Sequence, residues 1–181
     1  MSEKIKKGVS VKLTIKQRVA LIFISWLSMI GFDLFLHAGL LARLYTKPGP
    51  FLLSADQAFL RIPLGYLSFL VLAIILVWFM ETRNVVGWKS GLLFGLKFGA
   101  LLWLASTLGL YSISTAGWDL LLGWGIGQAL ELGIAGIVIG SGLAGKRLSK
   151  LVLWVVVFVV GMVIITVVLQ SVGFAPPMKI V

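Results

Sequence analysis

Five long apolar stretches occupy almost the whole of this 181-residue chain. An α-helix needs about 20 mostly apolar residues to cross the hydrocarbon core of a bilayer, and each stretch meets that length. Backbone groups inside a bilayer must be paired within the chain, which favours helices. The sequence therefore predicts an all-α integral membrane bundle of five transmembrane helices. The expected helices cover residues 18–43, 62–81, 90–112, 117–144 and 150–173.

Composition leaves no room for a water-soluble domain. Hydrophobic residues make up 60% of the chain and charged residues 12%, whereas a typical soluble domain has about 25% charged residues. The segments between the apolar stretches are too short to bury a core. We therefore expect a single transmembrane domain over residues 1–181, with residues 1–17 as a basic cytoplasmic tail.

The net charge of +10 is distributed unevenly along the chain. Cytoplasmic loops of membrane proteins carry an excess of Lys and Arg, which predicts a cytoplasmic N-terminus and an outside C-terminus. These cations suit anionic lipid head groups, and the basic run lacks the interleaved aromatics of nucleic-acid binders. The cytoplasmic side would carry Lys4, Lys6, Lys7, Lys12, Lys16, Arg18, Arg83, Lys89, Lys146, Arg147 and Lys150, against Arg43, Lys47, Arg61 and Lys179 opposite.

The longest loop, between the first two apolar stretches, has a helix-start signal of its own. Ser54 followed by Gln57 predicts a capping box that opens a short helix. Pro63 then either kinks this helix or lies in the first turn of the next one.

Glycines recur every four residues in the third and fourth apolar stretches. Small residues at this spacing let membrane helices approach closely. Two interpretations stay open: the glycine faces join the helices within one chain, or they contact a second copy or another subunit. The glycines concerned are Gly91, Gly95, Gly99, Gly123, Gly127, Gly136 and Gly140.

A few polar side chains lie deep within the apolar stretches. Asp33 and His37 share a helix face because they are one turn apart, and Gln128 and Glu131 lie near the middle of the fourth stretch. Ionisable groups are costly at bilayer depth, so they are usually kept for a function. The functional hypothesis is therefore that these residues form a proton- or cation-handling site. By the structural hypothesis they join helices through hydrogen bonds. Lys97 either extends towards the interface or pairs with one of the acids.

Known catalytic signatures are absent from the sequence. It contains no HExxH, Walker or GxSxG motif, no cysteine and a single histidine. We therefore expect no catalytic residues, no metal and no cofactor, and an enzymatic role is not favoured.

Four segments have a pattern shared with other small membrane proteins. They are FDLFLHAGLLARLY, GYLSFLVLAIILVWF, WKSGLLFGLKFGALLWLA and GWDLLLGWGIGQALELGIAG. The acidic first helix, glycine-rich third helix and Trp-led fourth helix resemble small prokaryotic polytopic membrane proteins classed as domains of unknown function. This resemblance implies the helix order and no known activity, and with it we expect a prokaryotic plasma membrane.

The preferred functional prediction is a non-enzymatic subunit or accessory of a larger membrane assembly. Its partners would be the lipid bilayer and other membrane subunits or further copies of the chain. The alternative is a small proton- or ion-coupled transporter or channel that uses Asp33, His37 and Glu131.

Overall fold

A computed structural model describes residues 13–46 and 51–176 of the chain. All the regular secondary structure of the described part is helical, and five of its helices are long and apolar enough to cross a membrane. The predicted fold class is therefore confirmed. The elements are α1 (Ile15–Phe35), the π-helix η1 (Leu36–Leu40), the 3-10 helix η2 (Ala42–Thr46), α2 (Ala55–Thr82), α3 (Trp88–Ile113), α4 (Trp118–Leu143) and α5 (Leu148–Ser171).

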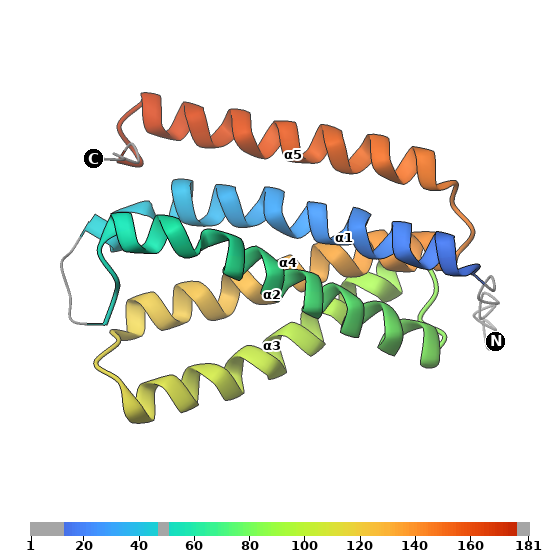
Figure 1. Cartoon of the computed structure of the whole chain (residues 1–181), viewed down its shortest axis with the longest axis horizontal. Coiled ribbons are helices and arrows are strands. Elements are labelled where there is room, and N and C mark those ends of the chain that lie inside the picture. The colour runs from blue at the N-terminus through green and yellow to red at the C-terminus, as the bar shows by residue number, and fades with distance from the viewer. Residues whose placement is uncertain (1–12, 47–50, 177–181) are drawn as a thin grey trace, which may run out of the picture.

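Helix α4 is the central element of the bundle. It contacts α1, α2, α3 and α5, and α1 in turn contacts α2 and α5. Figure 1 shows α5 running beside α1, and α3 at the other side of the bundle with α4. Helix α1 begins and α5 ends at opposite ends of the long axis, as an odd number of spanning helices requires (Figure 1).

Apolar side chains divide into a core and an outer surface. The outer face of α5 exposes large residues such as Leu153 and Trp154, which are 63% and 69% exposed. So much exposed apolar surface is unusual for a soluble protein and fits contact with lipid chains. The largest fully buried apolar side chains, at the centre of the bundle, are Leu21, Met29, Leu76, Val77, Met80, Leu121, Leu132, Ile139 and Leu143.

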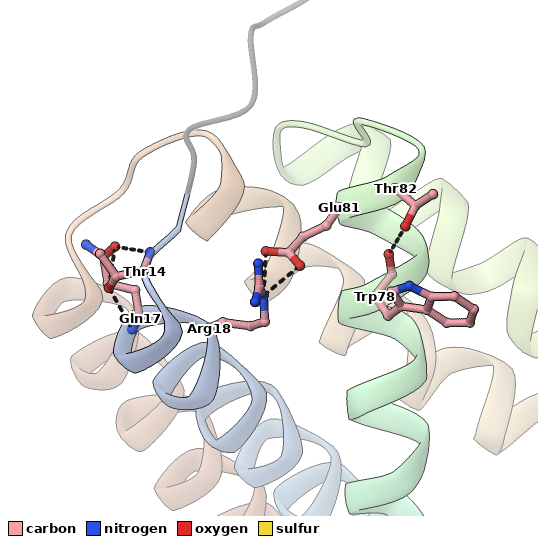
Figure 2. A network of polar contacts seen from close by, with 6 residues as sticks. All are labelled: Thr14, Gln17, Arg18, Trp78, Glu81 and Thr82. Carbon is pink, nitrogen blue, oxygen red and sulfur yellow. Dashed lines mark hydrogen bonds and ion pairs between the residues drawn. The ribbon is translucent and has the colours of Figure 1, made fainter.

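A capping box starts α1 at Ile15, three residues before the predicted boundary. The backbone N–H of Gln17 donates to Thr14 Oγ1 (3.3 Å), and the backbone N–H of Thr14 donates to Gln17 Oε1 (2.9 Å) (Figure 2). The reciprocal bonds satisfy donors that the first turn would leave free. Residues 1–12 of the predicted basic tail lie outside the described residues.

An ion pair joins the start of α1 to the end of α2. Figure 2 shows Arg18 facing Glu81, with Arg18 Nε 2.8 Å from Glu81 Oε2 and 3.1 Å from Oε1. The two helices are therefore antiparallel neighbours. The Arg18 side chain remains 45% exposed.

Helix α2 begins at Ala55, seven residues before the predicted boundary. Pro63 lies inside this continuous helix, so no separate short helix precedes it. A proline removes only one helical N–H, and membrane helices tolerate it where neighbouring groups re-pair the backbone. The capping box predicted at Ser54 is wrong, because Ser54 is the residue before the helix but makes no capping hydrogen bond through its side chain.

Helices α3 and α4 pack backbone against backbone along their glycines. A Cβ atom on Gly95 would lie 2.7 Å from the carbonyl carbon of Leu132, and one on Gly99 would lie 2.8 Å from Ala129 Cα. Only glycine permits this approach. The contact extends to the residue before α3, where the N–H of Gly87 donates to the carbonyl of Gly140 (2.8 Å). These glycines are therefore used within the chain.

Candidate functional site

Asp33 and His37 lie near the end of α1, one helical turn apart. His37 Nε2 is 3.2 Å from Asp33 Oδ1. The side chains are largely enclosed, with 14% of Asp33 and 30% of His37 exposed. The contact follows directly from their spacing in the sequence, since residues at i and i+4 share a helix face.

The helix widens where it carries His37. The segment Leu36–Leu40 is a π-helix, in which the N–H of Leu41 donates to the carbonyl of Leu36 (2.8 Å). From α5, Gln170 Nε2 donates to the carbonyl of Ala38 (3.1 Å). Single π-helical turns of this kind occur frequently at functional sites.

Glu131 brings a second carboxylate to the pair from α4. Its side chain is 0% exposed, and neither carboxylate oxygen has a hydrogen-bond partner among the described residues. One ligand atom from each of Asp33, His37 and Glu131 can be chosen so that all three lie within 4.8 Å of one another. Three ionisable groups, from α1, η1 and α4, therefore converge at one place in the bundle.

Small residues on α4 make this convergence possible. A Cβ atom on Gly127 would overlap the side chain of Leu36, and one on Gly123 would lie 3.0 Å from Leu41 Cδ2. Since Gly127 is one turn before Glu131, the end of α1 approaches α4 next to the carboxylate. The predicted role of these two glycines in close packing thus applies to the contact with α1 and η1, while Gly91, Gly95, Gly99, Gly136 and Gly140 serve the contact between α3 and α4 or its adjoining loop.

Gln128 lies on the same face of α4 as Glu131. It is 6% exposed, and its Oε1 also has no hydrogen-bond partner among the described residues. Residues three apart on a helix are neighbours. The α4 face therefore carries a neutral amide oxygen beside the Glu131 carboxylate.

Two hydrogen bonds that meet at Tyr45 hold the far side of the His37 ring. His37 Nδ1 is bonded to the hydroxyl of Tyr45, and Trp124 Nε1 donates to the same hydroxyl (2.7 Å). Burial raises the pKa of Tyr45 to about 12, so its hydroxyl keeps its proton at physiological pH. Since the indole only donates, the Tyr45 hydroxyl proton is free to point at His37 Nδ1. The Nε2–H of the ring then faces Asp33.

Lys97 is not part of the site. It is exposed on α3 and makes no ion pair with any other residue in the described ranges 13–46 and 51–176. The suggested salt bridge from Lys97 to Asp33 or Glu131 is therefore wrong, because the buried glycine face of α3 turns the lysine outwards.

Sequence reasoning missed the contribution of Tyr45 and Trp124 to the site. Tyr45 is eight residues after His37, but the intervening chain passes through a π-helix and a 3-10 helix. Regular helical spacing therefore gives no indication that the two rings meet. A tryptophan deep in the fourth apolar stretch was the only available signal.

A scan against protein-family models, a search of curated proteins and a search of solved structures each gave no match to this chain. The resemblance to small prokaryotic membrane proteins stays a prediction from the sequence. The geometry of Asp33, His37 and Glu131 is therefore what bears on function.

Proposed function

We propose that this chain is a small multi-pass membrane protein that binds a cation at Asp33, His37 and Glu131 and carries it across the membrane. The observation that supports this best is Glu131, a fully buried carboxylate with no hydrogen-bond partner among the described residues. An unpaired charge within a bilayer costs several kcal/mol, roughly 2.5–3.5 on insertion scales. A cation held between the three side chains would offset that cost.

The polar groups lie between the middle and one end of the bundle. Glu131 is near the middle of α4, Trp124 is two turns closer to the start of that helix, and Tyr45 follows the end of α1. Ionisable side chains inside membrane helices mark ion pathways, and Tyr45 and Trp124 continue the polar groups from the site towards this end. They support a route from the site to the end of the bundle where α1 stops.

We propose that this end faces the outside of the cell. The other end carries most of the cations in the described residues, which the positive-inside rule assigns to the cytoplasm. The cations at that end are Lys16, Arg18, Arg83, Lys89, Lys146, Arg147 and Lys150, against Arg43 and Arg61 at the outer end. The site would then communicate with the external solution.

The accessory-subunit hypothesis stays a prediction. One of its sequence-based supports is weaker, because the glycine faces that were candidates for contact with a partner are used inside the chain. Determining the mass of the intact protein after gentle detergent extraction tests for a stable complex. A subunit role also predicts no flux from the purified chain alone.

Reconstitution into proteoliposomes tests the transport proposal. Entrapped dyes that respond to pH and to divalent metals report cation entry. Wild-type protein should give a flux above empty liposomes, and Glu131→Gln should abolish it, because the amide keeps the shape but loses the negative charge. Asp33→Asn should act in the same way.

Asp119→Asn is the matched control. Asp119 lies exposed in the first turn of α4, so the same change of acid to amide on the same helix leaves the site intact. Its flux should equal that of wild type. No cation flux from well-folded wild-type protein, or equal flux from wild type and Glu131→Gln, would contradict the proposal.

A further inference from the structure

We infer that the cation held by Asp33, His37 and Glu131 is a divalent first-row transition-metal ion, such as Mn²⁺, Fe²⁺ or Zn²⁺. The inference deepens the proposed function by naming the class of cation, and it rests on that function for its biological role. It depends on three observations: the convergence of the ligand atoms, the chemistry of the donors and the hydrogen bonds behind the imidazole.

The ligand atoms are close enough to share one ion after small side-chain rotations. They lie within 4.8 Å of one another. Donors at about 2.1 Å from a tetrahedral zinc are roughly 3.4 Å apart. A closure of roughly an ångström is therefore needed. Among the described residues, no hydrogen bond to the Glu131 carboxylate opposes it.

The donor set distinguishes between classes of metal. Calcium and magnesium prefer sites made of oxygen alone, whereas imidazole favours zinc, iron and the other later metals. Two carboxylates with one imidazole form a mixed site for an ion that accepts both donors. Copper(I) prefers cysteine and methionine sulfur, and none of the three donors is a sulfur atom.

Charge balance favours a divalent ion over a monovalent one. Two ionised carboxylates and a neutral imidazole carry a charge of −2, which a divalent ion cancels. A single proton or sodium ion would leave one net negative charge in a largely buried site, and buried net charge is costly. Among single bound ions, a divalent one leaves the whole site neutral.

Tyr45 and Trp124 position the imidazole for this role. Metal-binding histidines generally use their second ring nitrogen in a hydrogen bond that orients the ring, and His37 Nδ1 is bonded to the Tyr45 hydroxyl. With a metal on Nε2, the ring proton would be on Nδ1 and would point at Tyr45. The Tyr45 oxygen has two lone pairs, so it can accept from both His37 and Trp124.

Metal binding to purified, tag-free protein in detergent tests the inference. The chain has one histidine, so a tag-free sample has only one imidazole. Titration with Zn²⁺ or Mn²⁺ in excess Mg²⁺ should show one site per chain. Pulsed electron paramagnetic resonance of bound Mn²⁺ should show coupling to one imidazole nitrogen, and His37→Gln should remove it.

Variants separate ligands from positioning residues. Glu131→Gln and Asp33→Asn should weaken binding by more than the roughly 10–100-fold that loss of an outer partner costs. Tyr45→Phe should weaken binding by about 10–100-fold while keeping the nitrogen coupling, since it leaves the ligand in place. Asp119→Asn should bind like wild type.

Two outcomes overturn the inference: no binding of either ion to folded wild-type protein, or equal binding by wild type and Glu131→Gln. The result is independent of the transport proposal. Proton flux without metal binding leaves the transport function standing and refutes the metal. Stoichiometric metal binding without any flux supports the metal site and refutes transport.

Discussion

Gly91 and Gly136 face each other so closely that a Cβ atom on either one would overlap the backbone of the other. The overlap is reciprocal: a Cβ on Gly91 would lie 2.8 Å from the carbonyl carbon of Gly136, and a Cβ on Gly136 would lie 2.8 Å from that of Gly91. Backbone atoms cannot rotate away as side chains can. This pair therefore fixes the distance between α3 and α4.

Replacing Gly91 tests this contact. Gly91→Ala should lower the free energy of unfolding by about 1–3 kcal/mol or more, since 1–3 kcal/mol is the usual cost of overpacking. Gly109→Ala on the same helix is the control, because a Cβ there would meet nothing within 4 Å. Thermal unfolding in detergent measures both. Equal melting temperatures for the two variants would show that α3 and α4 are not in backbone contact.

The ion pair between Arg18 and Glu81 should contribute little to stability. The Arg18 side chain is 45% exposed, and exposed ion pairs are typically worth about 0–1 kcal/mol. A double-mutant cycle with Arg18→Gln and Glu81→Gln should give a coupling free energy within that range. A substantially larger value would mean that the pair is shielded from water.

The proposed orientation predicts the positions of two reporter fusions. A reporter after Val181 should lie outside the cell, and one in the loop between α2 and α3 should lie in the cytoplasm, because the cations gather at the latter end. Alkaline phosphatase and fluorescent-protein fusions measure this in cells. Reporters found on the same side would contradict five membrane crossings.

The helices and the pairing of Asp33 with His37 could be predicted because they depend on local periodicity. Apolar runs gave five spanning helices, and a separation of four residues placed the two side chains 3.2 Å apart. The approach of Glu131 does not follow from periodicity, because it depends on how two helices far apart in the sequence pack. Gly127, one helical turn before Glu131, leaves the space that the Leu36 side chain occupies.

The hydrogen bonds behind His37 could not be predicted, because they depend on a break in that periodicity. A π-helix replaces the α-helix at Leu36, and the chain then turns through η2 to bring Tyr45 back to the ring. The ion pair suggested for Lys97 is wrong for a related reason. Its charge suggested an acidic partner, but the packing of the glycine face of α3 against α4 leaves the Lys97 side chain on the outer face of the helix.

We propose that Glu131 serves a cation site and does not hold the helices together. The most direct test is the thermal unfolding of Glu131→Leu in metal-free detergent. Burying a carboxylate without a hydrogen-bond partner costs free energy, and Glu131 has no such partner among the described residues. An apolar side chain of similar size should therefore leave the melting temperature unchanged or raise it. A clearly lower melting temperature would contradict it, because the carboxylate would then be a structural link between α4 and its neighbours.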